Sequence, residues 1–305
     1  MPHYKAKLKP VFIVGTPRSG TTLLYRTLLK HPSFIPKYLC LEETKIFMEP
    51  DISILSKQKP ASLYNYMLKD SDVYEEFERS IKYESIWQEI CLKPGFLKFL
   101  LEKPAFWYFL LNKRVVNKFF FYARQARGCK RIVEKTPRHL FQYKRIFNSF
   151  PHSKIIATVR HPVDVFSSYK IRKQRDPDSN WLDITVSEFI KRYREMSSYA
   201  LELHETDNAL CLKYENFVRN PEREFKQICT HINEPFITDL LYEGEKRLIN
   251  YKVDPYLSKP ITQKTKNWSD YLNDDQVSQI ENGLQDEMSK FGYTSKLNNA
   301  SNSIE

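Results

Sequence analysis

A short apolar run at residues 11–14 leads into a loop bounded by Gly15 and Gly20, and from Thr21 apolar residues recur at helical spacing until Pro32. This order predicts a buried strand, a tight loop and a helix. The N-terminus of a helix presents unpaired N–H groups and partial positive charge, and glycines let the backbone close around an anion. The loop therefore predicts a phosphate site; the plainer alternative is a strand-to-helix turn with Ser and Thr caps.

Short apolar runs and helical stretches alternate along the rest of the chain. Three further buried strands are predicted at residues 131–133, 154–159 and 209–212. Helices are predicted at residues 137–147, 163–174, 186–205 and 221–231. Such alternation favours an α/β fold with a P-loop-like parallel sheet flanked by helices on both faces. We expect a single domain over residues 1–295 and a frayed polar tail over 296–305.

Residues from about 51 to 130 break this alternation, because they are rich in aromatic residues and indicate a helical insertion after the first strand–helix unit. Insertions at the carboxyl ends of strands usually shape the ligand site. Between Lys113 and Arg131 there are seven basic residues and no acidic one, interleaved with the aromatic residues 119–122. An amphipathic helix with a solvated basic face is the favoured interpretation, and a surface for membranes or nucleic acid is the alternative.

Charge and cysteine content narrow the class of protein. The chain has 48 Lys and Arg against 37 Asp and Glu, a net charge of +11, which favours an anionic partner. Its 5 cysteines are dispersed without a C-x-x-C pair, which argues against a zinc motif or a disulfide framework and favours a reducing compartment. No apolar run approaches the roughly 18 residues of a membrane span, and no signal-peptide core is present. We therefore expect a soluble cytoplasmic protein without a membrane anchor.

The loop spacing G-x-x-x-x-G matches the P-loop of nucleotide triphosphatases, but Thr21 replaces the following Lys and Thr22 takes the hydroxyl position. A kinase or ATPase needs that Lys, together with Mg²⁺ and a carboxylate at a strand end. Here the strand at 154–159 runs into Arg160. The pattern therefore favours a nucleotide handled without a metal. A P-loop kinase lacking the usual Lys and a basic nucleic-acid or membrane-surface binding protein are the alternative functions.

The sequence PRSGTT at 17–22 resembles the 5'-phosphosulfate loop of sulfotransferases that use 3'-phosphoadenosine 5'-phosphosulfate (PAPS), with Arg18 placed as in the tyrosylprotein sulfotransferases. A second signature of this family is a strand ending in Arg, followed eight residues later by Ser. VRHPVDVFSSY supplies Arg160 and Ser168, and Arg172 matches a basic residue of the tyrosylprotein enzymes. The resemblance implies that these three residues bind the 3'-phosphate. It implies that the 5'-phosphate is bound by Arg18, Ser19, Gly20, Thr21 and Thr22.

Three other stretches support this resemblance. VEKTP at 133–137 is similar to the E-K-[ST]-P stretch of heparan sulfate sulfotransferases, which implies that Lys135 lies at the transferring sulfonate. CLEETK at 40–45 resembles the stretch that carries the catalytic base of tyrosylprotein sulfotransferases, by position Glu43, with Glu42 left open. KYENFVRNP implies that Tyr214 lies at the nucleotide.

The chain departs from the family pattern near its C-terminus. The family has a basic residue directly before a Trp, whereas Asn267 precedes Trp268 here and the basic residue is Lys266, our candidate for nucleotide binding. Ser258 is the nearest counterpart of the family's active-site Ser. Of the histidines, His161 is interpreted as a loop and cap residue, and His139 as a candidate for acceptor binding or a second base.

The resemblance implies transfer of a sulfonate from PAPS to a hydroxyl or amine by in-line displacement, with no metal. Glu43 would act as the base, while Arg18 and Lys135 would stabilise charge. The expected partners are PAPS or its product 3',5'-adenosine bisphosphate (PAP) and an acceptor: a peptide tyrosine, a sugar or a small lipid-like alcohol. No nucleic acid is expected, and a homodimer is left open.

Overall fold

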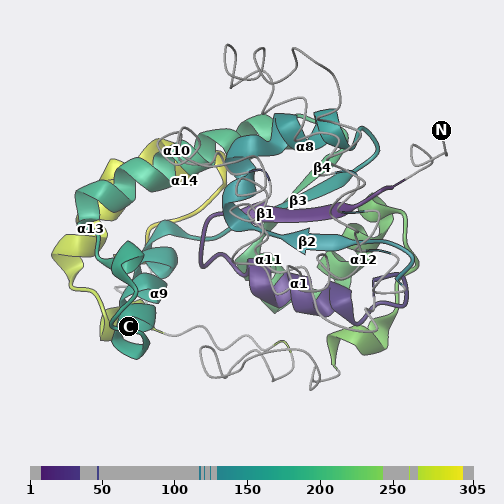
Figure 1. Ribbon diagram of the computed structural model, residues 1–305. Helices are drawn as coiled ribbons and strands as arrows, with labels where there is room; N and C mark the ends of the chain where they lie inside the picture. Colours follow the sequence, from purple (N-terminus) through teal and green to yellow (C-terminus); the bar gives the residue numbers. More distant parts are fainter. Residues whose placement is uncertain are drawn as a thin grey trace, which may run out of the picture. The chain divides into compact units, whose positions relative to one another are not determined.

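The computed structural model describes residues 8–34, 47, 117, 120, 124, 129–242, 261 and 267–297 (Figure 1). Its strands are β1 (Val11–Gly15), β2 (Val133–Lys135), β3 (Lys154–Val159) and β4 (Ala209–Lys213). They form one sheet in the order β2–β1–β3–β4. β3 and β4 run parallel, with Ile155 opposite Ala209 and Val159 opposite Lys213. The predicted α/β fold with a parallel sheet flanked by helices is confirmed.

The α-helices are α1 (Thr21–Leu29), α8 (Tyr143–Ser149), α9 (Pro162–Arg175), α10 (Val186–His204), α11 (Tyr214–Arg219), α12 (Pro221–Ile232), α13 (Asp274–Gly283) and α14 (Gln285–Lys290). Short 3-10 helices are η1 (Pro137–Gln142), η2 (Asn180–Leu182), η3 (Thr238–Leu241) and η5 (Trp268–Asp270). A capping box of Thr185 and Glu188 begins α10. Proline at the first turn begins α9 and α12. The helices predicted at 163–174, 186–205 and 221–231 are confirmed, and the stretch predicted as a helix at 137–147 is divided between η1 and α8.

The second strand differs from its prediction, because β2 begins at Val133 and runs through Glu134 and Lys135, whereas the sequence indicated a strand at 131–133. All three residues of β2 are buried. A charged residue can continue a buried strand when its polar atoms are paired inside the protein, and Glu134 is paired in this way with Thr136 and His139. The apolar run alone could not reveal this pairing.

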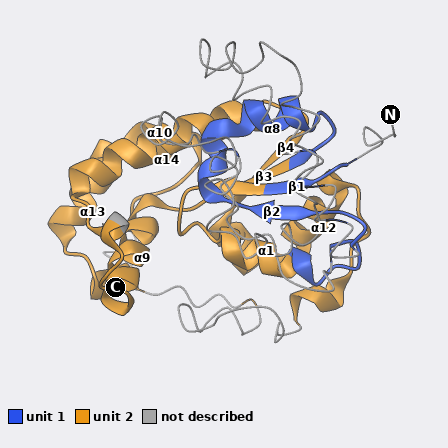
Figure 2. Cartoon of the chain, viewed as in Figure 1, with its two compact units in different colours: residues 1–12, 28–154 blue, residues 13–27, 155–305 orange. Residues whose placement is uncertain are grey.

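The chain divides into two compact units, coloured separately in Figure 2. Unit 1 comprises residues 1–12 and 28–154, and unit 2 comprises residues 13–27 and 155–305. The expectation of a single domain remains a prediction. In unit 1 the core contains a cluster of four aromatic rings: Phe120 lies 5.5 Å from Phe12 and 5.0 Å from Phe150, and Phe47 lies 5.8 Å from Phe12.

In unit 2 the hydrophobic core joins side chains of α9, α10 and α13, including Phe166, Phe189 and Ile280. Leu297 packs against this core, and the backbone N–H of Lys296 donates to Glu281 at 2.7 Å. Both residues were expected in the frayed tail, so the packed chain extends at least to residue 297.

Most of the expected insertion at 51–130 and the tail at 298–305 lie outside the described residues. In the part of the chain that the structure describes, no helix combines the length and the apolar character that crossing a membrane requires.

Candidate functional site

The loop after β1 is fixed to the end of β3 within unit 2. The Ser19 hydroxyl donates to the carbonyl of Thr16 at 2.5 Å and lies 2.7 Å from the hydroxyl of Thr158. Gly15 has a φ of 140°, and a Cβ at this position would collide with the backbone of Thr158. Glycine is therefore required at residue 15 for the loop to approach β3 this closely.

Arg18 joins two of the predicted binding residues. Its Nε donates to the Ser168 hydroxyl on α9 at 3.1 Å, and its backbone carbonyl accepts from Nη1 of Arg160 at 3.2 Å. Arg18 adopts a φ of 69°, an uncommon conformation for a residue with a Cβ, and such conformations often occur at functional sites. The structure thus brings Arg18, Arg160 and Ser168 together, and their roles in binding remain predictions.

Tyr214 completes this cluster. The Arg160 guanidinium lies 4.5 Å from the centre of the Tyr214 ring, and a Cβ on Gly20 would collide with the same ring. The Nε of Arg160 is buried and has no hydrogen-bond partner among the described residues. A buried cationic donor without a partner is costly unless a ligand satisfies it. This arrangement fits an anion bound beside Arg160.

The first turn of α1 supplies the remaining predicted donors. The Leu24 amide donates to the Gly20 carbonyl at 3.1 Å, which places the start of the helix at the second loop glycine. The N–H groups of Thr21 and Thr22 lie in the first turn, where a helix provides no backbone acceptor. The Ser19 amide donates to Thr16, so Ser19 also maintains the shape of the loop. The cluster combines first-turn amides with two arginines and therefore suits a ligand that carries phosphate groups.

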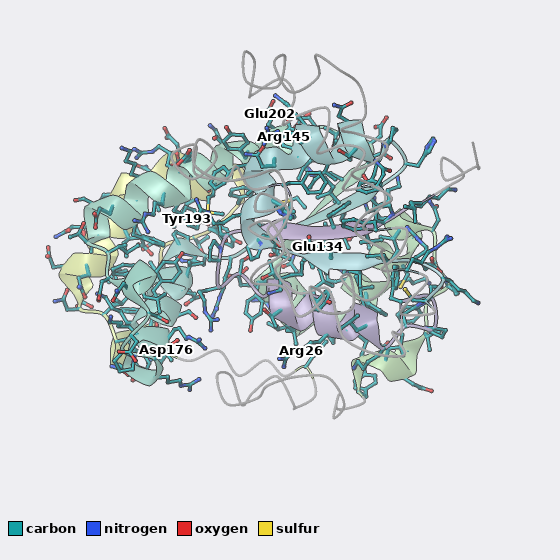
Figure 3. The ribbon with its side chains drawn as sticks, viewed as in Figure 1. Arg26, Glu134, Arg145, Asp176, Tyr193 and Glu202 are labelled. Atoms are coloured by element: carbon teal, nitrogen blue, oxygen red, sulfur yellow. The ribbon has the colours of Figure 1, made fainter. Side chains whose placement is uncertain are left out.

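Arg172 contacts a different side chain. Its Nη2 donates at 2.9 Å to Asp176, the residue directly after the end of α9, and Asp176 is labelled in Figure 3. Hydrogen bonding from Ser179, and then the charge of Arg172, lowers the pKa of the Asp176 carboxyl. The role of Arg172 in binding the 3'-phosphate remains a prediction.

The carboxyl end of β2, in unit 1, holds a second polar cluster, and Figure 3 labels its Glu134. Glu134 and Lys135 are 0% and 1% exposed. Glu134 accepts from the Thr136 hydroxyl at 2.5 Å, and its second oxygen lies 3.1 Å from Nδ1 of His139. The backbone N–H of Phe47 donates to Nε2 of His139 at 3.2 Å. Lys135 therefore lies on a strand end that this buried network holds in place.

The interpretation of His139 as an acceptor-binding residue or second base is corrected by this network. His139 is fully buried. Because Nε2 accepts the Phe47 amide, the proton is assigned to Nδ1, which donates to Glu134. Both ring nitrogens are therefore engaged inside unit 1, in contacts that residue type alone could not reveal.

His161 is confirmed as a cap residue, since its Nδ1 accepts the Val163 amide at the start of α9 and its Nε2 lies 3.0 Å from the Thr294 carbonyl. Burial is the main cause that lowers the pKa of its imidazole.

Four sequence candidates lie outside the described residues: Glu42, Glu43, Ser258 and Lys266. Sequence reasoning also missed three residues that contact Arg160 or its neighbours, namely Tyr193, Glu215 and Tyr293. Glu215 follows Tyr214 in the KYE motif, and this position was its only signal. No group of three or more metal-ligating side chains occurs in the part of the chain that the structure describes.

Comparison with known proteins gives consistent matches. A sequence model described as "Sulfotransferase family" matches residues 10–239, well over half of the chain. Omega-hydroxy-beta-dihydromenaquinone-9 sulfotransferase Stf3 of Mycobacterium bovis is 26% identical over 253 residues, and the same values hold for Mycobacterium tuberculosis. The match covers 73% of this chain and 62% of those relatives, so the chain spans less than two thirds of their length.

Two solved structures share the fold. The sulfotransferase domain from the curacin biosynthetic pathway aligns with a TM-score of 0.59 and 18% identity, covering 94% of this chain and 99% of that domain. The sulfotransferase domain from the Synechococcus olefin synthase gives a TM-score of 0.54 and 20% identity, with 91% and 96% covered.

Proposed function

The chain belongs to the sulfotransferase family, and from this we propose that it transfers a sulfonate group from PAPS to a hydroxyl of an acceptor. One observation carries the choice of donor. Arg160 has a buried Nε without a hydrogen-bond partner among the described residues, and its guanidinium lies over Tyr214. A residue in this position can bind the 3'-phosphate, the group that distinguishes PAPS from ATP.

The residues of the unit 2 cluster fit a nucleotide with phosphates at both ends of its ribose. Arg18 and the amides of Gly20, Thr21 and Thr22 would hold the 5'-phosphate, with Ser19 maintaining the loop. Arg160 and Ser168 would donate to the 3'-phosphate, joined by Arg172. Tyr214, by its motif, and Lys266, the basic residue nearest before Trp268, would also lie at the nucleotide. PAPS, when bound, supplies the activated sulfonate and a phosphate leaving group, and it requires no metal.

Positioning and charge stabilisation would do most of the catalysis. The bond between sulfur and the bridging phosphate oxygen breaks while a bond forms between sulfur and the acceptor oxygen. Lys135 would stabilise the negative charge that develops on the bridging oxygen, with Arg18 at the neighbouring phosphate. Glu43 would accept the proton of the acceptor hydroxyl. The motif resemblance to tyrosylprotein and heparan sulfate sulfotransferases supports these roles.

For the acceptor we propose an apolar alcohol. The Mycobacterium relatives are named for a hydroxylated menaquinone, a lipid-like alcohol. The residues at 51–130 are rich in aromatic side chains, which could line an apolar acceptor pocket. An amine, a sugar and a peptide tyrosine are the other outcomes of an acceptor screen.

Nucleotide binding tests the donor directly. Thermal unfolding is measured with and without PAP in the absence of Mg²⁺. We expect PAP to raise the melting temperature of the wild type, with little effect on Arg18→Ala or Arg160→Ala. Arg160→Ala should raise the KM for PAPS strongly. Its melting temperature without ligand should stay close to that of the wild type. Wild-type protein that saturating PAP fails to stabilise would contradict the assignment.

Transfer itself is measured with sulfur-labelled PAPS and matched acceptors: a long-chain primary alcohol, the corresponding amine, a sugar and a tyrosine peptide. We expect label on the long-chain alcohol, and loss of transfer in Glu43→Gln but not in Glu42→Gln. The reverse result for the two glutamates would move the base by one residue. Label on the peptide or sugar alone would overturn the proposed acceptor while leaving the donor intact.

A further inference from the structure

The peptide group that links Arg160 to His161 is held at both of its polar atoms by side chains of unit 2. The Tyr193 hydroxyl, on α10, donates to the Arg160 carbonyl at 2.7 Å. Glu215, in the first turn of α11, accepts the His161 N–H at 2.8 Å. Most buried backbone groups pair with other backbone groups, so side-chain partners at both atoms of one peptide form a specific arrangement. This peptide is attached directly to the Arg160 Cα, and its orientation therefore restricts the path of the Arg160 side chain.

A segment near the C-terminus holds this arrangement from a second direction. We call residues 292–297 the strap. The Tyr293 hydroxyl donates to the second oxygen of Glu215 at 3.2 Å. The Thr294 carbonyl accepts from Nε2 of His161 at 3.0 Å, and the His161 and Tyr293 rings meet edge to face at 5.2 Å. The strap thus contacts the residue that follows Arg160 and the residue that follows Tyr214.

The strap is itself attached to helices of unit 2. The amide of Lys296 donates to Glu281 on α13, and its ammonium lies 3.2 Å from Asp164 in the first turn of α9. Gly292 begins the strap with a φ of 63°, a conformation that favours glycine, and its carbonyl accepts from the Lys213 ammonium at 3.3 Å. Contacts at both ends therefore keep Tyr293 and Thr294 in place.

The protonation states of Tyr193, Tyr293 and His161 agree with the hydrogen bonds that these side chains make. Burial, and secondarily the charge of Glu215, raises the pKa of both Tyr193 and Tyr293 well above the usual range of a phenol. Both hydroxyls therefore remain protonated donors near neutral pH. Burial lowers the pKa of His161, which favours a neutral ring that accepts at Nδ1 and donates at Nε2.

We propose that Tyr193, Glu215 and Tyr293 form a clamp that positions Arg160 for the 3'-phosphate and so sets the preference for 3'-phosphorylated nucleotides. The inference rests on the proposed function. A guanidinium is a planar fork whose hydrogen bonds to phosphate depend on its direction, so a small rotation of its backbone weakens them. The proposed function assigns Arg18 and the first-turn amides to the 5'-phosphate, which PAP shares with 5'-AMP. The clamp should therefore affect PAP and leave 5'-AMP almost unchanged.

The test compares dissociation constants for PAP and 5'-AMP, measured by isothermal titration calorimetry on the full chain. In Tyr293→Phe and Tyr193→Phe we expect the Kd of PAP to rise about tenfold, the effect of one weakened charge-assisted hydrogen bond. The Kd of 5'-AMP should change less than about twofold because its contacts are unaltered. Glu215→Gln keeps an acceptor for the His161 amide and should give a smaller loss. With PAPS, the KM should rise while kcat at saturation is retained.

Tyr242→Phe is the matched control. Tyr242 also donates to a glutamate, Glu222, at 2.6 Å, but on an exposed surface. Its removal should leave both dissociation constants unchanged. The clamp is overturned if the variants keep the wild-type ratio of the two dissociation constants. It is also overturned if the binding of both nucleotides weakens equally while the melting temperature of the variant falls. The proposed function stands in either case. Wild-type protein that binds neither nucleotide overturns both.

Discussion

The carboxyl ends of β3 and β2 hold their cations in different ways. At the end of β3, in unit 2, the guanidinium of Arg160 is partly accessible, and side chains on its backbone fix its direction. At the end of β2, in unit 1, Lys135 is 1% exposed and follows a fully buried glutamate. An accessible, directed guanidinium suits recognition of a stable phosphate. A buried ammonium exerts a stronger field on charge that develops nearby. Under the proposed function, Arg160 would bind the nucleotide and Lys135 would take part in the transfer, and the predictions below test this division.

The largest effect expected from this comparison concerns Lys135. Lys135→Met keeps the length of the side chain and removes its charge. We expect kcat to fall about 100-fold or more, as when a single group that stabilises the transition state is lost. The Kd of PAP should rise by a much smaller factor, because the oxygen that leaves sulfur becomes one of three charged oxygens of the 5'-phosphate of PAP, which other groups also bind. Single-turnover transfer from labelled PAPS measures the first quantity, and calorimetry measures the second.

The control for Lys135 is Lys130→Met, which removes an exposed lysine five residues earlier and should leave both quantities unchanged. An unaltered kcat in Lys135→Met would remove this residue from the chemistry. A loss confined to PAP affinity would show instead that the two strand ends share the work of binding.

A smaller effect, on stability, is expected at the residue beside Lys135. In Glu134→Gln the side-chain NH₂ group replaces one of the two carboxylate oxygens. It cannot accept the hydrogen bond from the Thr136 hydroxyl or from Nδ1 of His139, whichever of the two it faces. We expect the free energy of unfolding to fall by about 1–3 kcal/mol, because a buried polar group loses its partner. Denaturant unfolding followed by circular dichroism measures this change.

The exposed Glu222, which accepts from Tyr242, supplies the control variant Glu222→Gln and should give a much smaller change in stability. Equal stability of Glu134→Gln and wild type would show that the β2 end does not depend on a carboxylate with two donors. It would then no longer be supported that a buried hydrogen-bond network holds Lys135 in place at the end of β2.

The parts that the sequence predicted are those in which local pattern is sufficient. A run of β-branched and apolar residues and two glycines determine β1 and its loop, because burial and backbone conformation are local demands. The Arg160 and Ser168 pair came from the resemblance to the sulfotransferase motif, and helix geometry explains why that spacing can recur, since eight residues along the start of a helix place Ser168 at a fixed distance from the strand end.

The missed features depend on distant parts of the chain. Tyr293 reaches Glu215 across 78 residues, and Phe47 reaches His139 across 92. Neither Tyr nor Phe carries a signal of such a partner, because both residue types are ordinary members of a hydrophobic core. The predicted strand also stopped before Glu134 for this reason, because the internal partners of Glu134 could not be seen from its residue type.

The smallest effect is expected from a substitution of Arg172. For this residue the contact in the structure differs from the role that the motif assigns. The motif assigns it to the 3'-phosphate, whereas its guanidinium donates to Asp176. In Arg172→Ala we expect the Kd of PAP to rise only about twofold to threefold, because a partly exposed cation already paired with a carboxylate has little to contribute.

The neighbouring Lys173, paired with Asp183 at 2.6 Å, supplies the control. Lys173→Ala should have no effect on PAP, and Asp176→Asn should tighten PAP binding because it releases Arg172 from its carboxylate. Each dissociation constant is measured at low and at high salt. If Arg172→Ala and Lys173→Ala weaken PAP equally, and high salt removes both effects, Arg172 contributes only general positive charge. The directed recognition of the 3'-phosphate would then belong to Arg160 and Ser168, the pair that the structure already joins through Arg18.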